Sequence, residues 1–97
     1  MREYEVTVIF QPTLEEQPRN ELVELVSNWL VPDADEESKP TLDVWGRRRM
    51  AYPIEKHQDG FYVLYHVVMD PTRIGEVERN MEYNEDILRY LVIRKAE

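Results

Sequence analysis

Residues 59–71 read Asp-Gly-Phe-Tyr-Val-Leu-Tyr-His-Val-Val-Met-Asp-Pro and predict three pieces of structure in succession. The run Phe61–Met69 is apolar at nearly every position, which is typical of a strand at the centre of a sheet. The preceding segment His57–Gly60 ends in Asp-Gly, a strong signal for the turn of a β-hairpin. After the strand, Asp70 can cap a helix whose first position is taken by Pro71. A hairpin turn, a central strand and a helix start are therefore expected here.

The flanking segments supply the other strands and helices. Glu3–Gln11 alternates between apolar and polar residues, the period of a strand with one buried face. A helix is expected from near Glu16 or Gln17 until Pro32, because apolar residues recur there at steps of three and four. The polar segment 33–40 should then be a surface loop. The remaining elements are a second strand at Thr41–Ile54 bulged near Gly46, a second helix with the apolar stripe Ile74, Val77 and Met81, and a fourth strand at Ile87–Arg94.

The resulting order, βαββαβ, predicts the α+β class and the ferredoxin-like split βαβ arrangement. In this arrangement two helices cover one face of a four-stranded antiparallel sheet, and strands one and three are central. Pro53 has no N–H to donate, which puts the second strand at an edge. The length suffices for one core, so residues 1–97 are expected to form a single domain. The side chains expected to face the helices are Val6, Val8, Phe10, Val63, Tyr65, Val67, Tyr90 and Val92, and those expected on the open face are Glu5, Thr7, Tyr62, Leu64, His66, Arg89 and Leu91.

The formal net charge of −8 argues against a protein that coats nucleic acid by bulk electrostatics. The charge is uneven, because residues 1–46 carry three cations and eleven anions, whereas residues 47–97 carry nine of each. Any contact with RNA must therefore be local, and the acidic part would face solvent or a basic partner. No apolar run is long enough to span a membrane, no signal peptide precedes Tyr4, and the absence of cysteine excludes disulfides and thiolate metal sites.

The basic residues concentrate in Trp45–Lys56, whose twelve residues carry four cations and one anion. Arginine binds phosphate through its planar fork, and the aromatic residues Trp45 and Tyr52 can stack on bases. The stretch therefore indicates a local site for nucleic acid. The alternative is an edge strand whose charges only protect it from pairing with other strands.

Alternation along this strand separates its three arginines. Arg47 and Arg49 should project to one side and Arg48 to the other, unless a bulge at Gly46 intervenes. At least one arginine must therefore reach away from the core.

No catalytic, metal or cofactor site is predicted. The two histidines, His57 and His66, lack the spacing of zinc ligands. The three glycines are too far apart for a phosphate-binding loop, and the serines have no basic partner at a suggestive spacing. An RNA-recognition motif requires a cation and a small residue where Asp59 and Tyr62 stand, so the basic edge is a better RNA site than the sheet face. We therefore expect that the protein is not an enzyme.

Three stretches share their order and spacing with a known family. They are Met1–Glu5, then Gly46–Ile54 followed by Lys56 and Gly60–Tyr62, and finally Glu85–Tyr90. Within the middle stretch, the segment Arg-Met-Ala-Tyr-Pro-Ile is the most specific part. Over nearly its whole length the chain resembles the family of bacterial small-subunit ribosomal protein six (the S-six family). Many members carry a longer C-terminal tail, whereas this sequence ends at Glu97.

The resemblance implies a structural constituent of the small ribosomal subunit, located in the cytoplasm. It implies binding to small-subunit rRNA in the central domain (platform), as a heterodimer with ribosomal protein S-eighteen. That partner is small and basic, which matches the acidic surface expected here. Neither DNA nor a membrane is implied as a partner. The positions at which the resemblance implies RNA or partner contacts are Arg48, Arg49, Tyr52, Lys56 and Arg2, and the basic edge adds Arg47.

Arg2 is included because the start of the first strand can lie near the other basic residues. The alternative function is a ferredoxin-like regulatory module that binds a small ligand or self-associates through strand edges. In that case the basic edge would only keep the protein soluble.

Overall fold

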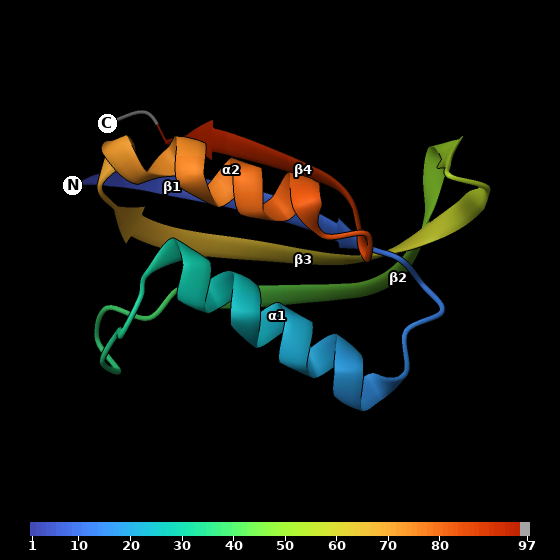
Figure 1. Cartoon of the computed structure of the whole chain (residues 1–97), viewed down its shortest axis with the longest axis horizontal. Helices are drawn as coiled ribbons and strands as arrows, with labels where there is room; N and C mark the ends of the chain where they lie inside the picture. Colours follow the sequence, from blue (N-terminus) through green and yellow to red (C-terminus); the bar gives the residue numbers. More distant parts are fainter. Residues whose placement is uncertain (96–97) are drawn as a thin grey trace.

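The computed structural model describes residues 1–95 and shows a four-stranded sheet with both helices on one of its faces (Figure 1). All the predicted strands and helices are present, and no helix within residues 1–95 is long and apolar enough to cross a membrane. In chain order the elements are β1 (Arg2–Phe10), α1 (Glu16–Leu30), β2 (Thr41–Ile54), β3 (His57–Met69), the 3-10 turn η1 (Pro71–Arg73), α2 (Ile74–Tyr83) and β4 (Ile87–Arg94).

The strands are ordered β2-β3-β1-β4, and each neighbouring pair is antiparallel. β1 and β3 are therefore central, and β2 lies at an edge, where the missing N–H of Pro53 is tolerated. Together with the helices on one face, this order confirms the predicted ferredoxin-like split βαβ fold.

The helix-facing side of the sheet forms the core. Val8, for example, lies opposite Val63 on one side and Tyr90 on the other, so the three side chains share a face. Every predicted helix-facing residue of β1 and β3 is buried, and those of β4 are half-buried against the core. Burying one such side chain stabilises the fold by about 1.5–3 kcal/mol, and a slip of one residue would expose the whole set. The helices contribute Leu22, Val23, Val26, Leu30, Val77 and Met81.

Two polar contacts hold α1 against the rest of the molecule. In the core, the hydroxyl of Tyr65 on β3 donates to the carbonyl oxygen of Val23 at 2.9 Å. Burial raises the pKa of Tyr65, so this hydroxyl keeps its proton and its hydrogen bond. At the end of α1, the guanidinium of Arg73 donates to the carbonyl oxygens of Trp29 (2.9 Å) and Leu30 (3.0 Å). Carbonyl groups in a last helical turn have no partner inside the helix, so Arg73 supplies the missing donors.

The predicted helix start at Asp70 is confirmed, although its first turn is not α-helical. The carboxylate of Asp70 accepts the N–H of Thr72 at 3.0 Å, and Pro71 follows the cap. The hydrogen bonds from the N–H and the hydroxyl of Thr72 lower the pKa of Asp70, because they favour the charged carboxylate. The capped turn is η1, and the regular helix α2 begins only at Ile74.

The predicted position of the β2–β3 turn is wrong. Asp59 and Gly60 lie inside β3, which begins at His57, and the chain reverses at Glu55 and Lys56 instead. Both turn residues have positive φ, 48° and 71°, as a tight two-residue hairpin connection requires. Gly60 serves packing rather than turning, because a Cβ built there would overlap Cγ2 of Ile9 on β1.

The β2–β3 hairpin is longer than the sheet that it belongs to. The pairing of β3 with β1 stops at Phe61, opposite Phe10, so the part of β3 before Phe61 pairs with β2 alone. We call residues 48–60 the hairpin arm. Figure 1 shows its green-to-yellow tip projecting beyond the ends of the other strands.

Candidate nucleic-acid interface

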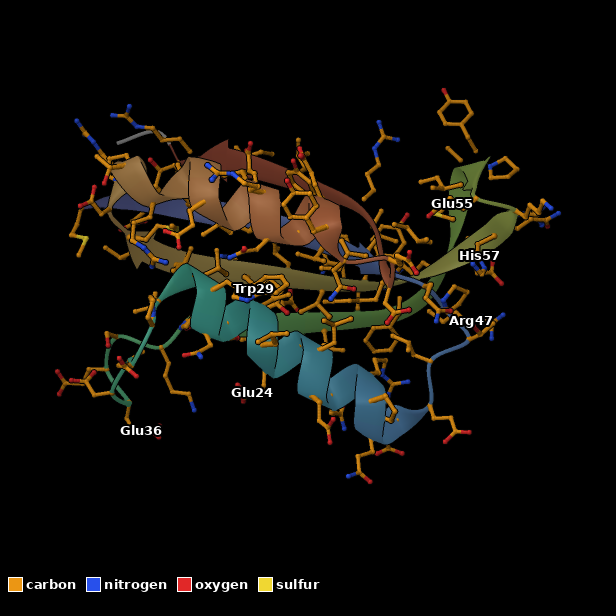
Figure 2. All side chains as sticks on the ribbon, in the orientation of Figure 1. Glu24, Trp29, Glu36, Arg47, Glu55 and His57 are labelled. Carbon is orange, nitrogen blue, oxygen red and sulfur yellow. The ribbon has the colours of Figure 1, made fainter. Side chains whose placement is uncertain are left out.

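The hairpin arm and its base hold five of the six predicted contact residues. Arg47 lies at the base of the arm, and Arg48, Arg49, Tyr52 and Lys56 lie within it; all five are exposed. In Figure 2, Arg47 lies at the same end of the molecule as the turn, where Glu55 and His57 are labelled. The edge position of β2 leaves this series of side chains open to a partner.

A bulge sets the direction of the arginines. The register of β2 against β3 shifts between Val44 and Gly46, and Gly46 takes the positive φ of 80° that glycine adopts without strain. Beyond the bulge, Arg47 lies opposite Phe61 and Arg48 opposite Gly60. Neighbouring residues of a strand point to opposite faces, which confirms that Arg47 and Arg49 share one side and Arg48 the other.

The three arginines differ in how much of their charge is engaged. Arg47 forms an ion pair with Asp59 across the hairpin, with its Nη2 at 3.3 Å from Oδ2. Both side chains are substantially exposed, so the pair contributes only about 0–1 kcal/mol and can open for a stronger anion. The guanidinium of Arg48 lies over the ring of Trp45, at 5.7 Å from its centroid. Within residues 1–95, Arg49 and Lys56 have neither an ion-pair nor a hydrogen-bond partner through their side chains, so both cations are available to phosphate.

A second irregularity exposes Tyr52. The register shifts again between Arg49 and Ile54, so residues 50–53 leave the regular ladder, at a place where Pro53 needs no hydrogen bond. Met50 turns inward and is buried, whereas Tyr52 is 73% exposed. The ring of Tyr52 is therefore presented to solvent beside the cations of the arm.

Trp45 has an aromatic partner that sequence reasoning did not identify. Its ring stacks on Tyr62 of β3, with 6.3 Å between the centroids and 11° between the planes. Val44 lies opposite Val63, so alternation along β2 places Trp45 on the open face with Tyr62, and the bulge at Gly46 brings Arg48 onto that face as well.

The expectation that Arg2 lies near the other basic residues is wrong. Arg2 begins β1 and pairs with Met69 at the end of β3, whereas Arg47 pairs with Phe61 near the start of β3. Met69 and Phe61 lie on the same strand, so at about 3.4 Å per residue Arg2 and Arg47 are roughly 27 Å apart along the strand direction. Arg2 therefore belongs to the opposite end of the sheet, and a contact there would be separate from the arm.

Apart from Glu55 and Asp59, which belong to the arm, many acidic side chains lie on and after α1. The exposed surface of α1 carries Glu16, Glu21 and Glu24, and the loop after the helix carries Glu36 and Glu37. Figure 2 shows Glu36 at the end of the molecule opposite the arm, and Glu24 on the outer side of α1. The positive arm and this negative surface are thus separated in space as well as in sequence.

The exposed cations and aromatic rings of the arm and its base are suited to binding anions and flat rings. Within the part of the chain that the structure describes, no group of three or more His, Cys, Asp or Glu residues is placed to hold a metal ion. The two histidines lie on different parts of β3, His57 at the turn and His66 on the open face opposite Glu5.

Comparison with known proteins gives a consistent set of similarities. A sequence model of the family described as Ribosomal protein S6 matches residues 3–94. The small ribosomal subunit protein bS6 of Fusobacterium nucleatum is 39% identical over 95 residues, which cover 98% of this chain and 99% of that protein. The protein of the same name from Desulforamulus reducens is 39% identical over 97 residues and is covered completely, as is this chain. The solved structure of 30S ribosomal protein S6 from Thermotoga maritima is similar with a TM-score of 0.86 and 27% identity, over 97% of this chain and 87% of that one.

Proposed function

The chain belongs to the ribosomal protein S6 family of the small ribosomal subunit, and on that premise we propose that it binds small-subunit rRNA through its hairpin arm. Its place is then the ribosome, in the cytoplasm. The rRNA it binds is that of the central domain (platform), and it binds as a heterodimer with ribosomal protein S-eighteen. Its role is structural rather than catalytic.

The observation that supports this proposal is the contrast between the arm and the rest of the molecule. Arg48, Arg49 and Lys56 are exposed on a hairpin that projects from a body whose net charge is negative. Affinity for RNA rests largely on local contacts between cations and phosphates, each of which releases counterions. A projecting arm can bring its cations to the phosphates while the acidic body stays further away.

The acidic surface supports the partnership. A chain of net charge −8 is repelled by RNA at long range, so alone it should bind weakly. A small basic partner docked on the molecule would offset this repulsion. The proposal therefore predicts that the heterodimer binds rRNA much more tightly than the isolated chain does.

A salt series tests the role of the arm. The affinity of the heterodimer for a central-domain rRNA fragment is measured by filter binding at several salt concentrations. Replacing Arg48 and Arg49 by Ala should weaken binding by roughly 1–3 kcal/mol per good contact and reduce the salt dependence by about one phosphate for each arginine. The matched control is Arg79→Ala, which removes an exposed cation of α2 that lies outside the arm.

Equal affinities and equal salt slopes for the wild type and the double variant would contradict the proposal. Loss of binding in the control as well would mean that net charge matters rather than the arm. A separate check is whether the protein sediments with the small subunit in a gradient, since a regulatory module would not do so.

A further inference from the structure

An aromatic pair with an adjacent cation lies on the face of the sheet that the helices leave open. Trp45 and Tyr62 stack with nearly parallel rings, and the guanidinium of Arg48 lies over Trp45. Trp45 is 43% exposed, and Tyr62 is half-buried beside Ile9. A large flat ring is thus presented to solvent beside an arginine that has no acidic partner within residues 1–95.

The strand register extends this feature across the sheet. Tyr62 lies opposite Ile9 on β1, and Ile9 lies opposite Arg89 on β4. The row on the open face therefore runs from Arg89 through Ile9 and Tyr62 to Trp45, and Arg48 lies next to Trp45 along β2. Both arginines are exposed, so the aromatic pair has a cation on each side.

Packing alone gives no reason for this arrangement. The core lies on the opposite face, under the helices, and neither aromatic residue belongs to it. The bulge at Gly46 brings Arg48, opposite Gly60, onto the open face beside Trp45, whereas in a regular ladder Arg47 would lie on that face. A ring used only to cover apolar surface would be better buried than one that is 43% exposed.

We propose that Trp45, backed by Tyr62, is a stacking platform for an unpaired base of RNA, and that Arg48 holds a phosphate beside it. The inference rests on the proposed rRNA binding and specifies its target. An aromatic ring can stack only on a base that has left its helix, since the bases of a double helix already stack on one another. The platform therefore selects a bulge, loop or strand end, whereas the cations of the arm alone would accept any phosphate backbone.

The test uses the heterodimer and the central-domain rRNA fragment, with two replacements at one position. Trp45→Leu keeps an apolar side chain but removes the ring, and it should weaken binding about 10-fold to 100-fold, or roughly 1–3 kcal/mol. Trp45→Phe keeps a ring and should retain most of the affinity. Stacking releases no counterions. In the salt series, the plot of log affinity against log salt concentration for Trp45→Leu should therefore be parallel to that of the wild type, whereas the plot for an arginine variant should have a smaller slope.

The control is Tyr83→Leu, which removes a ring that is 80% exposed on α2 and should leave binding unchanged. Circular dichroism and the affinity for the protein partner are measured for each variant. The inference is overturned if Trp45→Leu binds RNA like the wild type, if Trp45→Phe loses as much as Trp45→Leu, or if the loss occurs in the affinity for the protein partner. Each of these results leaves the rRNA binding of the arm intact, whereas a wild-type heterodimer that does not bind rRNA refutes the proposed function itself.

A second measurement tests for the unpaired base directly. The chain has two tryptophans, so in a Trp29→Phe variant the fluorescence reports on Trp45 alone. A short single-stranded RNA at low ionic strength should quench this fluorescence and saturate, and the same strand annealed to its complement should quench it far less. Equal quenching by both, or none by the single strand, would overturn the inference.

Discussion

At the scale of single residues, Gly60 has little freedom to change. It lies in β3 where the side chain of Ile9 crosses directly over its backbone, and a Cβ would overlap Cγ2 of Ile9. Ile9 is β-branched, so this methyl group cannot rotate away without a change of rotamer. We expect Gly60→Ala to lower the free energy of unfolding by about 1–3 kcal/mol, as overpacking does elsewhere. The denaturant midpoint measures this effect.

Gly75 provides the matched comparison. A Cβ at Gly75, in the first turn of α2, meets nothing within 4 Å. Alanine favours a helix more than glycine does, so Gly75→Ala should raise the free energy of unfolding by about 0.5 kcal/mol. If both substitutions shifted the midpoint in the same direction, the close approach of Ile9 to Gly60 would not be the cause.

The residues of the core were predictable from local sequence, and the stacked pair was not. Alternation with a period of two needs no knowledge of the neighbouring strand, and it identified Val8 and Val63 correctly. The contact of Trp45 with Tyr62 depends on how β2 is aligned with β3, which alternation within one strand cannot reveal.

At the scale of elements, Arg73 joins the two helices. Its guanidinium closes the last turn of α1 from the turn that leads into α2, and its side chain is only 27% exposed. Hydrogen bonds from a charged group contribute about 1.5–3 kcal/mol, so Arg73→Leu should lower the free energy of unfolding by roughly that amount. Arg73→Lys should be intermediate, because an ammonium lacks the fork that reaches both carbonyl oxygens.

The control for Arg73 is Arg79→Leu, an exposed cation of α2, which should change stability by less than about 0.5 kcal/mol. Chemical unfolding of the three variants gives the comparison. Equal stability of Arg73→Leu and Arg79→Leu would show that the carbonyl groups of α1 are satisfied by water instead.

The extent of β2 and β4 was predicted correctly, but the turn between β2 and β3 was not. Asp-Gly is a common turn dipeptide, and Glu55-Lys56 carries no such signal. The glycine at position 60 is needed for the approach of β1, a contact between residues far apart in the sequence. The turn then falls on two residues that must adopt positive φ at some cost in strain.

At the scale of the whole molecule, the order of elements was enough to predict the topology. Few arrangements of βαββαβ satisfy short connections and a buried sheet face, which explains why the strand order could be anticipated. The position of Arg2 relative to the arm could not be predicted in this way, because it depends on which ends of the antiparallel strands lie side by side. The start of β1 meets the end of β3, far from the arm.

Alkaline pH should destabilise the whole fold through Tyr65. Burial raises the pKa of this hydroxyl in the folded state, so the stability that it contributes is complete below the ordinary tyrosine pKa of about 10 and is lost as pH rises above it. Tyr65→Phe should cost about 1 kcal/mol at neutral pH, through the hydrogen bond to Val23. The variant should then lose less stability than the wild type between neutral pH and about pH 11.

Unfolding curves at the two pH values measure the difference. The other five tyrosines are common to both proteins, so their titration cancels in the comparison. A stability gap that stays constant with pH would mean that Tyr65 can ionise without unfolding.

The hairpin arm separates the demands of folding from those of recognition. None of residues 51–58 belongs to the core cluster, and the tip of β3 pairs with β2 alone. Substitutions there can alter charge, aromatic content or length while the free energy of the body stays nearly constant. Under the proposed function, an rRNA site and the arm can thus diverge together over evolutionary time, without passing through poorly folded intermediates. The sequence of the arm can thus vary, while the sequence of the core is constrained by packing.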